Sequence, residues 1–290
     1  MTAQEKWIAA AFGETGLHAW AMQGPNTYAQ AFLEGCTSAT DPALLEQILS
    51  KLADDWLMAA PTRVLACGMK TGAYHPVPAN PAVLQPVALP AKDPQLDLFA
   101  LPGLKQTAPP DVMLGDETRI AGYLAVHDGW DGVICLPGLQ TCWAHVSAGE
   151  IVSFQTFLTG ELSLAVSHNP PLFASADLAN QNATVFLAEL ENTLSRPEKL
   201  AAALFSVRAR DLLEDQSEQQ AQARVWGVLI GAELAAARPY WLGQQLAIIA
   251  TPEIAALYGT ALQRQGVPVI IEDANAMALA GLTTAWRQLR

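Results

Sequence analysis

Two glycine-containing turns are places where the backbone could hold phosphate groups. The first lies in IAAAFGETGLHAW (8–20), where an apolar run breaks at Gly13, passes Thr15 and becomes apolar again. The second lies in VICLPGLQTCWAHV (133–146) and contains Gly138 and Thr141. Glycine has no Cβ, so backbone N–H groups at such a turn can approach a phosphate closely. Two such turns facing one another would bracket the β- and γ-phosphates of a nucleotide, whereas each turn alone is also consistent with an ordinary strand hairpin.

The segment GDET (115–118) contains two adjacent carboxylates, Asp116 and Glu117. A carboxylate there could act as the general base that takes the proton from an accepting hydroxyl group. Asp116 is also suited to be the N-cap of a helix, because its side chain can accept backbone N–H groups of the first helical turn. On these residues alone, both interpretations stay open.

Two further polar residues are candidates for contacts with a small anionic ligand. Thr159 precedes a glycine and a glutamate at a turn into a helix, which is consistent with a role beside a small anionic ligand or a metal ion and equally with helix capping. Arg208 in LFSVRA (204–209) could bind a substrate carboxylate with its guanidinium group, or form a surface or bridging ion pair. The histidines lack zinc-binding spacing, so no metal-ligating residue is assigned; they are His18, His75, His127, His145 and His168.

The composition is that of a folded protein with an acidic surface. The chain has 290 residues, of which 51% are hydrophobic and 15% charged, and a formal net charge of −12. This length suits two domains of about 100–150 residues each. The acidic excess disfavours nucleic acids and anionic membranes as partners, since both bind clustered Lys and Arg. A small anionic substrate needs only two or three well-placed cations and is therefore compatible with this charge.

Cysteine usage and hydropathy indicate a cytoplasmic protein. The four cysteines form no C-x-x-C pair and are expected to be buried free thiols in a reducing compartment. The N-terminal stretch MTAQEKWIAAAF has no long apolar segment and no processing site. The longest apolar candidate, VWGVLIGAELAAA (225–237), is too short to span a bilayer and contains Glu233.

Strands and helices are expected to alternate along the chain and to position these residues. The similar plan of 8–20 and 133–146 suggests two related halves, each opening with a strand hairpin. The segment from Tyr74 to Pro110 is rich in proline and alanine and predicts loop with short strands. Apolar periodicity predicts helices at 42–58, 117–123, 197–213, 223–237, 252–266 and 274–289, and strands at 62–68, 133–136, 141–146, 151–157, 246–250 and 267–272.

Several longer motifs follow one another along nearly the whole chain. They are Gly68-Met69 after VLAC, PDVMLGDET (110–118), LPGLQTCW (136–143), FQTFLTGEL (154–162), LFSVRA (204–209) and GVLIGAEL (227–234). Their order resembles that of the 2-dehydro-3-deoxygalactonokinase family. The resemblance implies an α/β fold of the actin-like, ribonuclease-H type, with two lobes around a central cleft. It also implies transfer of the γ-phosphate of ATP, with Mg²⁺, to the 6-hydroxyl of 2-keto-3-deoxygalactonate.

The resemblance also implies roles for individual residues. It favours catalysis over capping for Asp116 and Glu117, which fall where related kinases place the general base. The expected lobes are 1–127 and 128–290, and the last helix can return to pack on the first lobe. The expected partners are a sugar acid and a nucleotide, and a homodimer is left open. The remaining assignments are Gly13, Thr15, Gly138 and Thr141 for ATP phosphates, and Gly68, Met69, Thr159 and Arg208 for the substrate.

The phosphate-binding turns depart from the family pattern. The first family turn reads roughly D-W-G-T-T-N-L-R-A-W, and here Ala11 stands in place of the aspartate and His18 in place of the arginine. The second reads P-G-T-H-S-K-W, and here Leu139, Gln140 and Cys142 replace the threonine, histidine and lysine. An aspartate would orient Mg²⁺ or its water shell against the phosphates, and alanine cannot. These losses leave open an alternative function, a kinase-derived binding or regulatory protein without catalysis.

Overall fold

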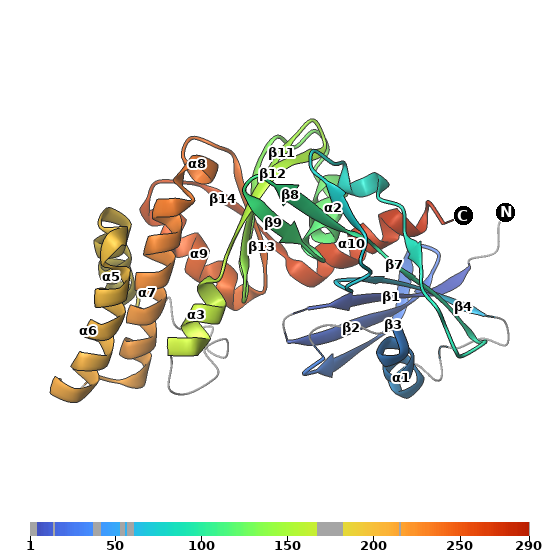
Figure 1. Cartoon of the computed structure of the whole chain (residues 1–290), viewed down its shortest axis with the longest axis horizontal. Coiled ribbons are helices and arrows are strands. Elements are labelled where there is room, and N and C mark those ends of the chain that lie inside the picture. The colour runs from blue at the N-terminus through green and yellow to red at the C-terminus, as the bar shows by residue number, and fades with distance from the viewer. Residues whose placement is uncertain are drawn as a thin grey trace. The chain divides into compact units, whose positions relative to one another are not determined.

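The computed structural model describes residues 5–13, 15–36, 42–52, 56, 61–166, 182–214 and 216–289 (Figure 1). The chain divides into two compact units. The first consists of Met1–Trp130, Ser147–Ser153 and Ala274–Arg290, and the second of Asp131–Val146 and Phe154–Asp273. The C-terminal segment thus belongs to the same unit as the N-terminal strands.

The first unit is built on a six-stranded sheet of order β3-β2-β1-β4-β7-β6. Its first three strands form two antiparallel hairpins, and β4 and β7 then extend the sheet in parallel. A separate three-stranded sheet has the order β5-β8-β9. The strands are β1 (Lys6–Phe12), β2 (Gly16–Gln23), β3 (Asn26–Glu34), β4 (Thr62–Cys67), β5 (Tyr74–Pro76), β6 (Val87–Ala88), β7 (Leu96–Ala100), β8 (Gly103–Thr107) and β9 (Pro110–Met113).

The central strand β1 is buried on both faces because a helix covers each side. Even-numbered residues such as Ile8 pack in a core cluster with Leu45 of α1 (Pro42–Leu52). Odd-numbered residues such as Trp7 pack with residues of α10 (Ala274–Trp286). The indole rings of Trp7 and Trp286 stack with centroids 5.1 Å apart. This explains why β1 reads as a continuous apolar run rather than an alternating one.

Helix α2 (Asp116–Val126) is held against α10 by close backbone packing within the first unit. A Cβ placed on Gly122 would overlap the carbonyl oxygen of Met277 and lie 2.8 Å from the backbone nitrogen of Gly281. A Cβ on Gly281 would in turn overlap the carbonyl oxygen of Thr118. Only glycine allows this approach, and the approach determines where the first residues of α2 lie. A short 3₁₀ helix, η2 (Pro81–Val83), completes the described helices of this unit.

The second unit repeats the strand pattern of the first. Its sheet has the order β12-β11-β10-β13-β14, with antiparallel pairing of β10 and β11 and parallel pairing of β10 with β13 and of β13 with β14. The strands are β10 (Gly132–Leu136), β11 (Thr141–Ser147), β12 (Glu150–Phe157), β13 (Leu246–Ala250) and β14 (Val269–Asp273). The helices are α3 (Thr159–Val166), α5 (Ala183–Ser195), η4 (Pro197–Lys199), α6 (Leu200–Leu213), α7 (Glu218–Ala236), α8 (Arg238–Trp241) and α9 (Pro252–Arg264).

Most predicted elements are confirmed. Both opening hairpins are present, and so are the predicted strands that follow them and the helices near the C-terminus. The helix predicted at 42–58 is described as far as Leu52, and residues 53–55 and 57–58 lie outside the described part. Helix α2 begins at Asp116, one residue before the predicted start, and ends at Val126. Strand β3 was not predicted, because its exposed face carries Tyr28 and Phe32 while its half-buried face carries Ala29 and Ala31, so polar and apolar residues do not alternate clearly.

Candidate active site

The first turn connects β1 to β2 and contains Gly13 and Thr15; Glu14 lies outside the described residues. The N–H group of Gly13 donates to the carbonyl oxygen of Gly16 at 2.8 Å, which closes the turn. The carbonyl oxygen of Thr15 accepts the N–H group of Gly35 at 2.8 Å, and its side chain is exposed. The turn is therefore held by backbone bonds, and the Thr15 side chain stays accessible.

Three backbone segments meet beside this turn. Gly68 follows β4 with a φ of +77°, and a Cβ on it would lie 2.8 Å from the carbonyl oxygen of Phe12. Gly115 precedes α2 with a φ of +97°, and a Cβ on it would lie 3.2 Å from Cα of Gly68. Both conformations favour glycine, and both contacts leave no room for a side chain. The structure thus brings the end of β1, the end of β4 and the start of α2 together.

The two carboxylates at the start of α2 have different surroundings. Asp116 forms an ion pair with Arg119, with 2.6 Å between Oδ1 and Nη1, and its side chain is 20% exposed. Glu117 is 1% exposed and accepts the N–H group of Gly115 at 2.7 Å and the hydroxyl group of Thr118 at 3.1 Å. The N-cap of α2 is Gly115 and has no side-chain cap, so Asp116 does not cap the helix as the alternative interpretation expected.

The surroundings also affect the pKa values of the two carboxyl groups differently. Burial raises the pKa of Glu117 from an ordinary 4.5 to about 8, so this side chain keeps its proton at neutral pH. Burial raises the pKa of Asp116 as well, but the positive charge of Arg119 opposes the shift. Cys67, at the end of β4, has its thiol pKa raised to about 12 by burial and by Glu117, and therefore stays a thiol. The two adjacent carboxyl groups therefore differ in their electrostatic surroundings, since Arg119 pairs with Asp116.

The second turn connects β10 to β11 and is attached to the N-terminus of α3. A Cβ on Gly160 would overlap the carbonyl oxygen of Gly138 and lie 2.7 Å from Cα of Leu139. The N–H group of Glu161 donates to the carbonyl oxygen of Leu139 at 2.9 Å. The side chain of Gln140 donates to the Glu161 carboxylate at 2.8 Å. These contacts fix the position of the turn without a lysine or histidine.

A buried carboxylate that sequence reasoning did not single out as a site residue lies in the same unit. Glu233 of α7 is 3% exposed and accepts the indole N–H group of Trp143 at 2.8 Å and the hydroxyl group of Tyr258 at 2.7 Å. It also accepts the hydroxyl group of Thr159. The hydroxyl oxygens of Thr141 and Tyr258 are 2.8 Å apart. Two predicted ligand-binding threonines are thus buried members of a polar network, and the signal for it was one acidic residue in the apolar stretch VWGVLIGAELAAA (225–237).

This network predicts a pH-dependent stability. Burial raises the pKa of Glu233 from 4.5 to about 7, so the folded protein holds the proton more tightly than the unfolded chain and loses stability as the pH rises through this window. Glu233→Gln keeps the side-chain shape and removes the titration. We expect the unfolding free energy of the variant, measured relative to that of wild type, to rise by about 2 kcal/mol from pH 5 to pH 7. Urea unfolding at several pH values measures this difference.

The control for removing one carboxylate is Glu214→Gln, on the exposed side chain that pairs with Arg210 on α6. The contribution of Glu117 is the same in wild type and in Glu233→Gln, so it cancels in the comparison. A difference between Glu233→Gln and wild type that stays constant from pH 5 to pH 7 would contradict the prediction.

The other predicted substrate residues lie in contrasting environments. The side chain of Met69 is buried in the core cluster on the α1 side of the first sheet. Arg208 is exposed on α6, where its neighbour Val207 packs against α7.

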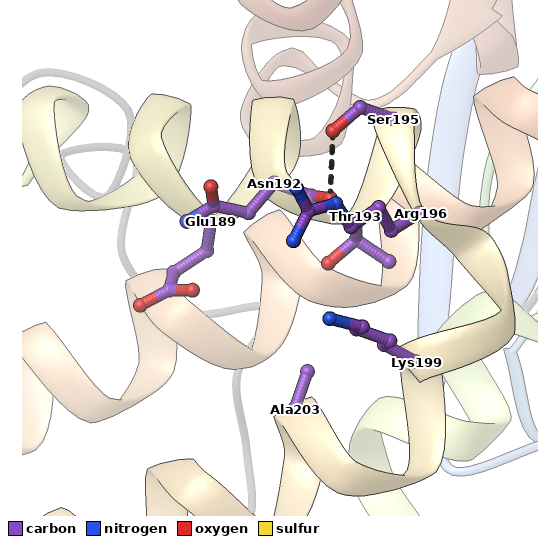
Figure 2. A pocket seen from close by; sticks show the side chains of 7 residues that line it. All are labelled: Glu189, Asn192, Thr193, Ser195, Arg196, Lys199 and Ala203. Carbon is purple, nitrogen blue, oxygen red and sulfur yellow. Dashed lines mark hydrogen bonds between the residues drawn. The ribbon is translucent and has the colours of Figure 1, made fainter.

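A pocket of about 290 Å³ in the second unit (Figure 2) is lined by seven residues. They are Glu189, Asn192, Thr193, Ser195, Arg196, Lys199 and Ala203.

Two polar side chains of that pocket are used in local structure. The hydroxyl group of Ser195 donates to the carbonyl oxygen of Asn192 at 3.0 Å, and the Glu189 carboxylate pairs with Arg224. We therefore assign no ligand to it.

Within the described ranges, no three His, Cys, Asp or Glu side chains gather as metal ligands. No described helix combines the length and the apolar character that crossing a membrane requires.

Comparisons with known proteins agree with this architecture. Residues 11–285 match the family described as 2-keto-3-deoxy-galactonokinase. The probable 2-dehydro-3-deoxygalactonokinase of Rhizobium meliloti (strain 1021) is 29% identical over 306 residues, covering 100% of this chain and 99% of the relative. The 2-dehydro-3-deoxygalactonokinase of Escherichia coli (strain K12) is 28% identical and covers 96% of both chains.

Solved structures show the fold. A crystal structure from Sinorhizobium meliloti, assigned as a 2-dehydro-3-deoxygalactonokinase, has a TM-score of 0.83 and 28% identity, covering 98% of this chain and 96% of that one. Component A of the (R)-2-hydroxyglutaryl-CoA dehydratase of Acidaminococcus fermentans has a TM-score of 0.55 at 13% identity and 98% coverage of both chains, a likeness of fold alone. The expected actin-like α/β fold is confirmed. This chain belongs to the 2-keto-3-deoxy-galactonokinase family.

Proposed function

We propose that this protein transfers the γ-phosphate of ATP to the 6-hydroxyl group of 2-keto-3-deoxygalactonate. The observation that carries the proposal is the family match over residues 11–285, together with curated relatives of that activity that align along nearly the whole chain. Neither the family match nor the relatives favour the alternative of a binding or regulatory protein without catalysis.

Asp116 is the proposed general base. The 6-hydroxyl oxygen of the sugar acid attacks the γ-phosphorus, the bond from that phosphorus to the β–γ bridging oxygen breaks, and ADP leaves. The hydroxyl proton passes to the carboxylate of Asp116, whose side chain is partly exposed. Glu117, which is protonated at neutral pH, instead holds Gly115 in place through its hydrogen bond.

The two turns are the proposed phosphate contacts, with Gly13 and Thr15 in the first and Gly138 and Thr141 in the second. In the second turn we expect the backbone to do most of the binding, because the hydroxyl group of Thr141 is buried against Tyr258. Mg²⁺ would neutralise charge on the phosphates when bound. Mg²⁺ usually keeps several waters and binds through substrate phosphates, so it would need few ligands from the chain.

The proposed substrate contacts are Gly68, Met69, Thr159 and Arg208. The side chain of Met69 is buried, so its backbone would make the contact, whereas the exposed guanidinium group of Arg208 suits the substrate carboxylate. The partners are then two small molecules, and a cytoplasmic location is part of the same proposal.

A coupled assay of ADP release tests the proposal. Purified protein with ATP, Mg²⁺ and 2-keto-3-deoxygalactonate should release ADP and form the 6-phosphate, while the C4 epimer of the sugar acid serves as the specificity control. ADP release no greater than that of boiled protein, across both sugar acids, would refute the kinase assignment.

A further inference from the structure

The elements on both sides of the second turn each contribute a buried hydroxyl group. Thr141 begins β11, directly after the turn, and is fully buried. Thr159 begins α3, the helix whose Gly160 packs on the backbone of the turn, and it is 4% exposed. Because a buried hydroxyl group needs a hydrogen-bond partner, both groups depend on contacts inside the second unit.

Both hydroxyl groups lead to the carboxyl group of Glu233 on α7. Thr159 donates to Oε2 directly, and the hydroxyl group of Tyr258 donates to the same oxygen at 2.7 Å. Tyr258 uses its single hydrogen in this bond, so the hydroxyl group of Thr141, 2.8 Å away, donates to the oxygen of Tyr258. Trp143, two residues further along β11, donates its indole N–H group to Oε1 at 2.8 Å. One carboxyl group thus connects α3, β11 and α9 to α7.

Placing a carboxyl group here costs the fold free energy. Glu233 is 3% exposed, and its partners Trp143 and Tyr258 belong to the apolar core cluster of the second unit. The side chains that donate to it are neutral, and burial raises the pKa of Tyr258 well above its ordinary value of 10, so Tyr258 keeps its proton. A leucine in this place would avoid the cost of taking a carboxyl group out of water. What the carboxyl group adds is a set of directed hydrogen bonds to three other elements.

The second turn depends on its backbone for binding phosphate. Leu139 and Cys142 stand where the family pattern has a threonine and a lysine. The side chain of Gln140 is already used, because it donates to the Glu161 carboxylate. Backbone N–H groups bind an anion when several of them converge on it. An affinity that comes from backbone geometry is therefore sensitive to small displacements of the segments that flank the turn.

We propose that Glu233 is a positioning residue for nucleotide binding, whose carboxyl group holds β11 and α3 so that the backbone of the second turn keeps its phosphate-binding conformation. This inference rests on the proposed function, because it takes the ligand of the turn to be the β- and γ-phosphates of a nucleotide. The carboxyl group does not touch the ligand. It acts on α3 through Thr159, and on β11 through Trp143 and Tyr258.

Calorimetric titration of the purified protein with AMP and with the non-hydrolysable analogue AMP-PNP tests this role. Tyr258→Phe keeps the aromatic ring and removes the hydroxyl group that joins Thr141 to Glu233. We expect this variant to bind AMP-PNP about 10-fold more weakly, since a displaced turn loses about one hydrogen bond to the phosphates. It should bind AMP as tightly as wild type does, because AMP has neither a β- nor a γ-phosphate.

Trp143→Phe and Trp241→Phe form a matched pair within one core cluster. Trp143 donates its buried indole N–H group to Glu233 at 2.8 Å. Trp241 donates its own, also buried, to the carbonyl oxygen of Leu234 at 2.8 Å. Both variants should therefore lose stability, as their melting temperatures will show, but only Trp143→Phe should weaken the binding of AMP-PNP.

Glu233→Leu and Glu233→Gln test whether a conservative change rescues binding. Leucine removes all the hydrogen bonds, so Glu233→Leu should lose at least as much AMP-PNP affinity as Tyr258→Phe. Glutamine keeps one acceptor oxygen and can donate to the hydroxyl oxygens of Thr159 and Tyr258, so it should recover part of the affinity. If Glu233→Leu does not fold, Tyr258→Phe and the tryptophan pair decide the question.

Kinetics supply a second readout. The turn is proposed to hold the phosphates in the ground state as well as in the transition state, so the KM for ATP should rise about 10-fold in Tyr258→Phe while kcat changes less than about threefold. A variant that is only less well folded has fewer active molecules, and it would instead show a lower kcat with an unchanged KM.

The outcomes separate this inference from the proposed function. If wild type prefers AMP-PNP to AMP, and Tyr258→Phe and Trp143→Phe reduce the preference while Trp241→Phe keeps it, the role of Glu233 stands even when no sugar acid is phosphorylated. If Tyr258→Phe and Trp143→Phe bind AMP-PNP as wild type does, or lose affinity for AMP to the same extent, the role is overturned while ADP release still decides the kinase assignment. If wild type shows no preference for AMP-PNP, this inference also fails.

Discussion

We expect Asp116→Asn to lower kcat by about 10²- to 10⁴-fold while the protein stays folded. The amide has nearly the same shape as the carboxylate but cannot take the proton of the accepting hydroxyl group. Asp116 is the first residue of α2 and its side chain is one-fifth exposed, so the substitution creates neither a cavity nor a clash. Steady-state ADP release with saturating ATP and sugar acid measures the effect.

The matched control for this variant is Asp97→Asn in the same unit. Asp97 also lies beside an arginine, with 3.7 Å between its carboxylate and Nε of Arg63, but it belongs to β7. The Asp97→Asn variant should have a kcat within about threefold of the wild-type value. Glu117→Gln is a further comparison, since a side chain that is already protonated at neutral pH should lose much less activity than Asp116. If Asp116→Asn keeps wild-type kcat, the base is another group.

The second large effect is expected from Gly122→Ala. The new methyl group would meet the carbonyl oxygen of Met277 and the backbone nitrogen of Gly281, and neither can turn aside as a side chain would. We expect a loss of about 3 kcal/mol in unfolding free energy, at the upper end of what overpacking costs. Because α2 must shift and carries Asp116, kcat should fall as well, by about 10²-fold for a displacement near 1 Å. Urea unfolding and the ADP assay measure the two effects.

Gly259→Ala is the control for adding a methyl group to a helical glycine. Gly259 lies in α9, and a Cβ there would come 3.4 Å from Cδ1 of Ile271, the end of a side chain that can move. Alanine favours a helix over glycine by up to about 1 kcal/mol, so this variant should be unchanged or slightly more stable. Equal stability losses in the two variants would mean that the contact of α2 with α10 is not the cause.

Local sequence patterns predicted most of the fold. Helix α9 has apolar residues at helical spacing between Pro252 and Gly266, α10 is a nearly continuous apolar run, and the apolar strands of each hairpin flank a glycine-containing turn, so these elements were expected where they occur. Strand β3 was missed because aromatic residues lie on its exposed face and small alanines on its half-buried face, which hides the alternation of polar and apolar residues. Its place is determined by its pairing with β2, which is a contact outside its own sequence.

The sequence predicted the parts of the candidate site that are contiguous in the chain, but not the contacts between distant residues. The two turns and the GDET segment are contiguous in the chain, so motif and spacing could find them. The partners of Glu233 come from β11, α3 and α9, and Tyr258 lies 117 residues from the threonine whose hydroxyl it meets. No local pattern connects them.

The sequence by itself determined that the chain is a two-hairpin α/β protein of this family and that an acidic pair begins one of its helices. It could not distinguish Asp116 from Glu117, because adjacent residues of the same chemistry have the same local signals. Only the tertiary structure gives them different surroundings: successive residues on a helix point about 100° apart, so one carboxylate faces partly into solvent beside a cation and the other into the core. Burial then raises the pKa of Glu117 to about 8, while the positive charge of Arg119 opposes the rise at Asp116.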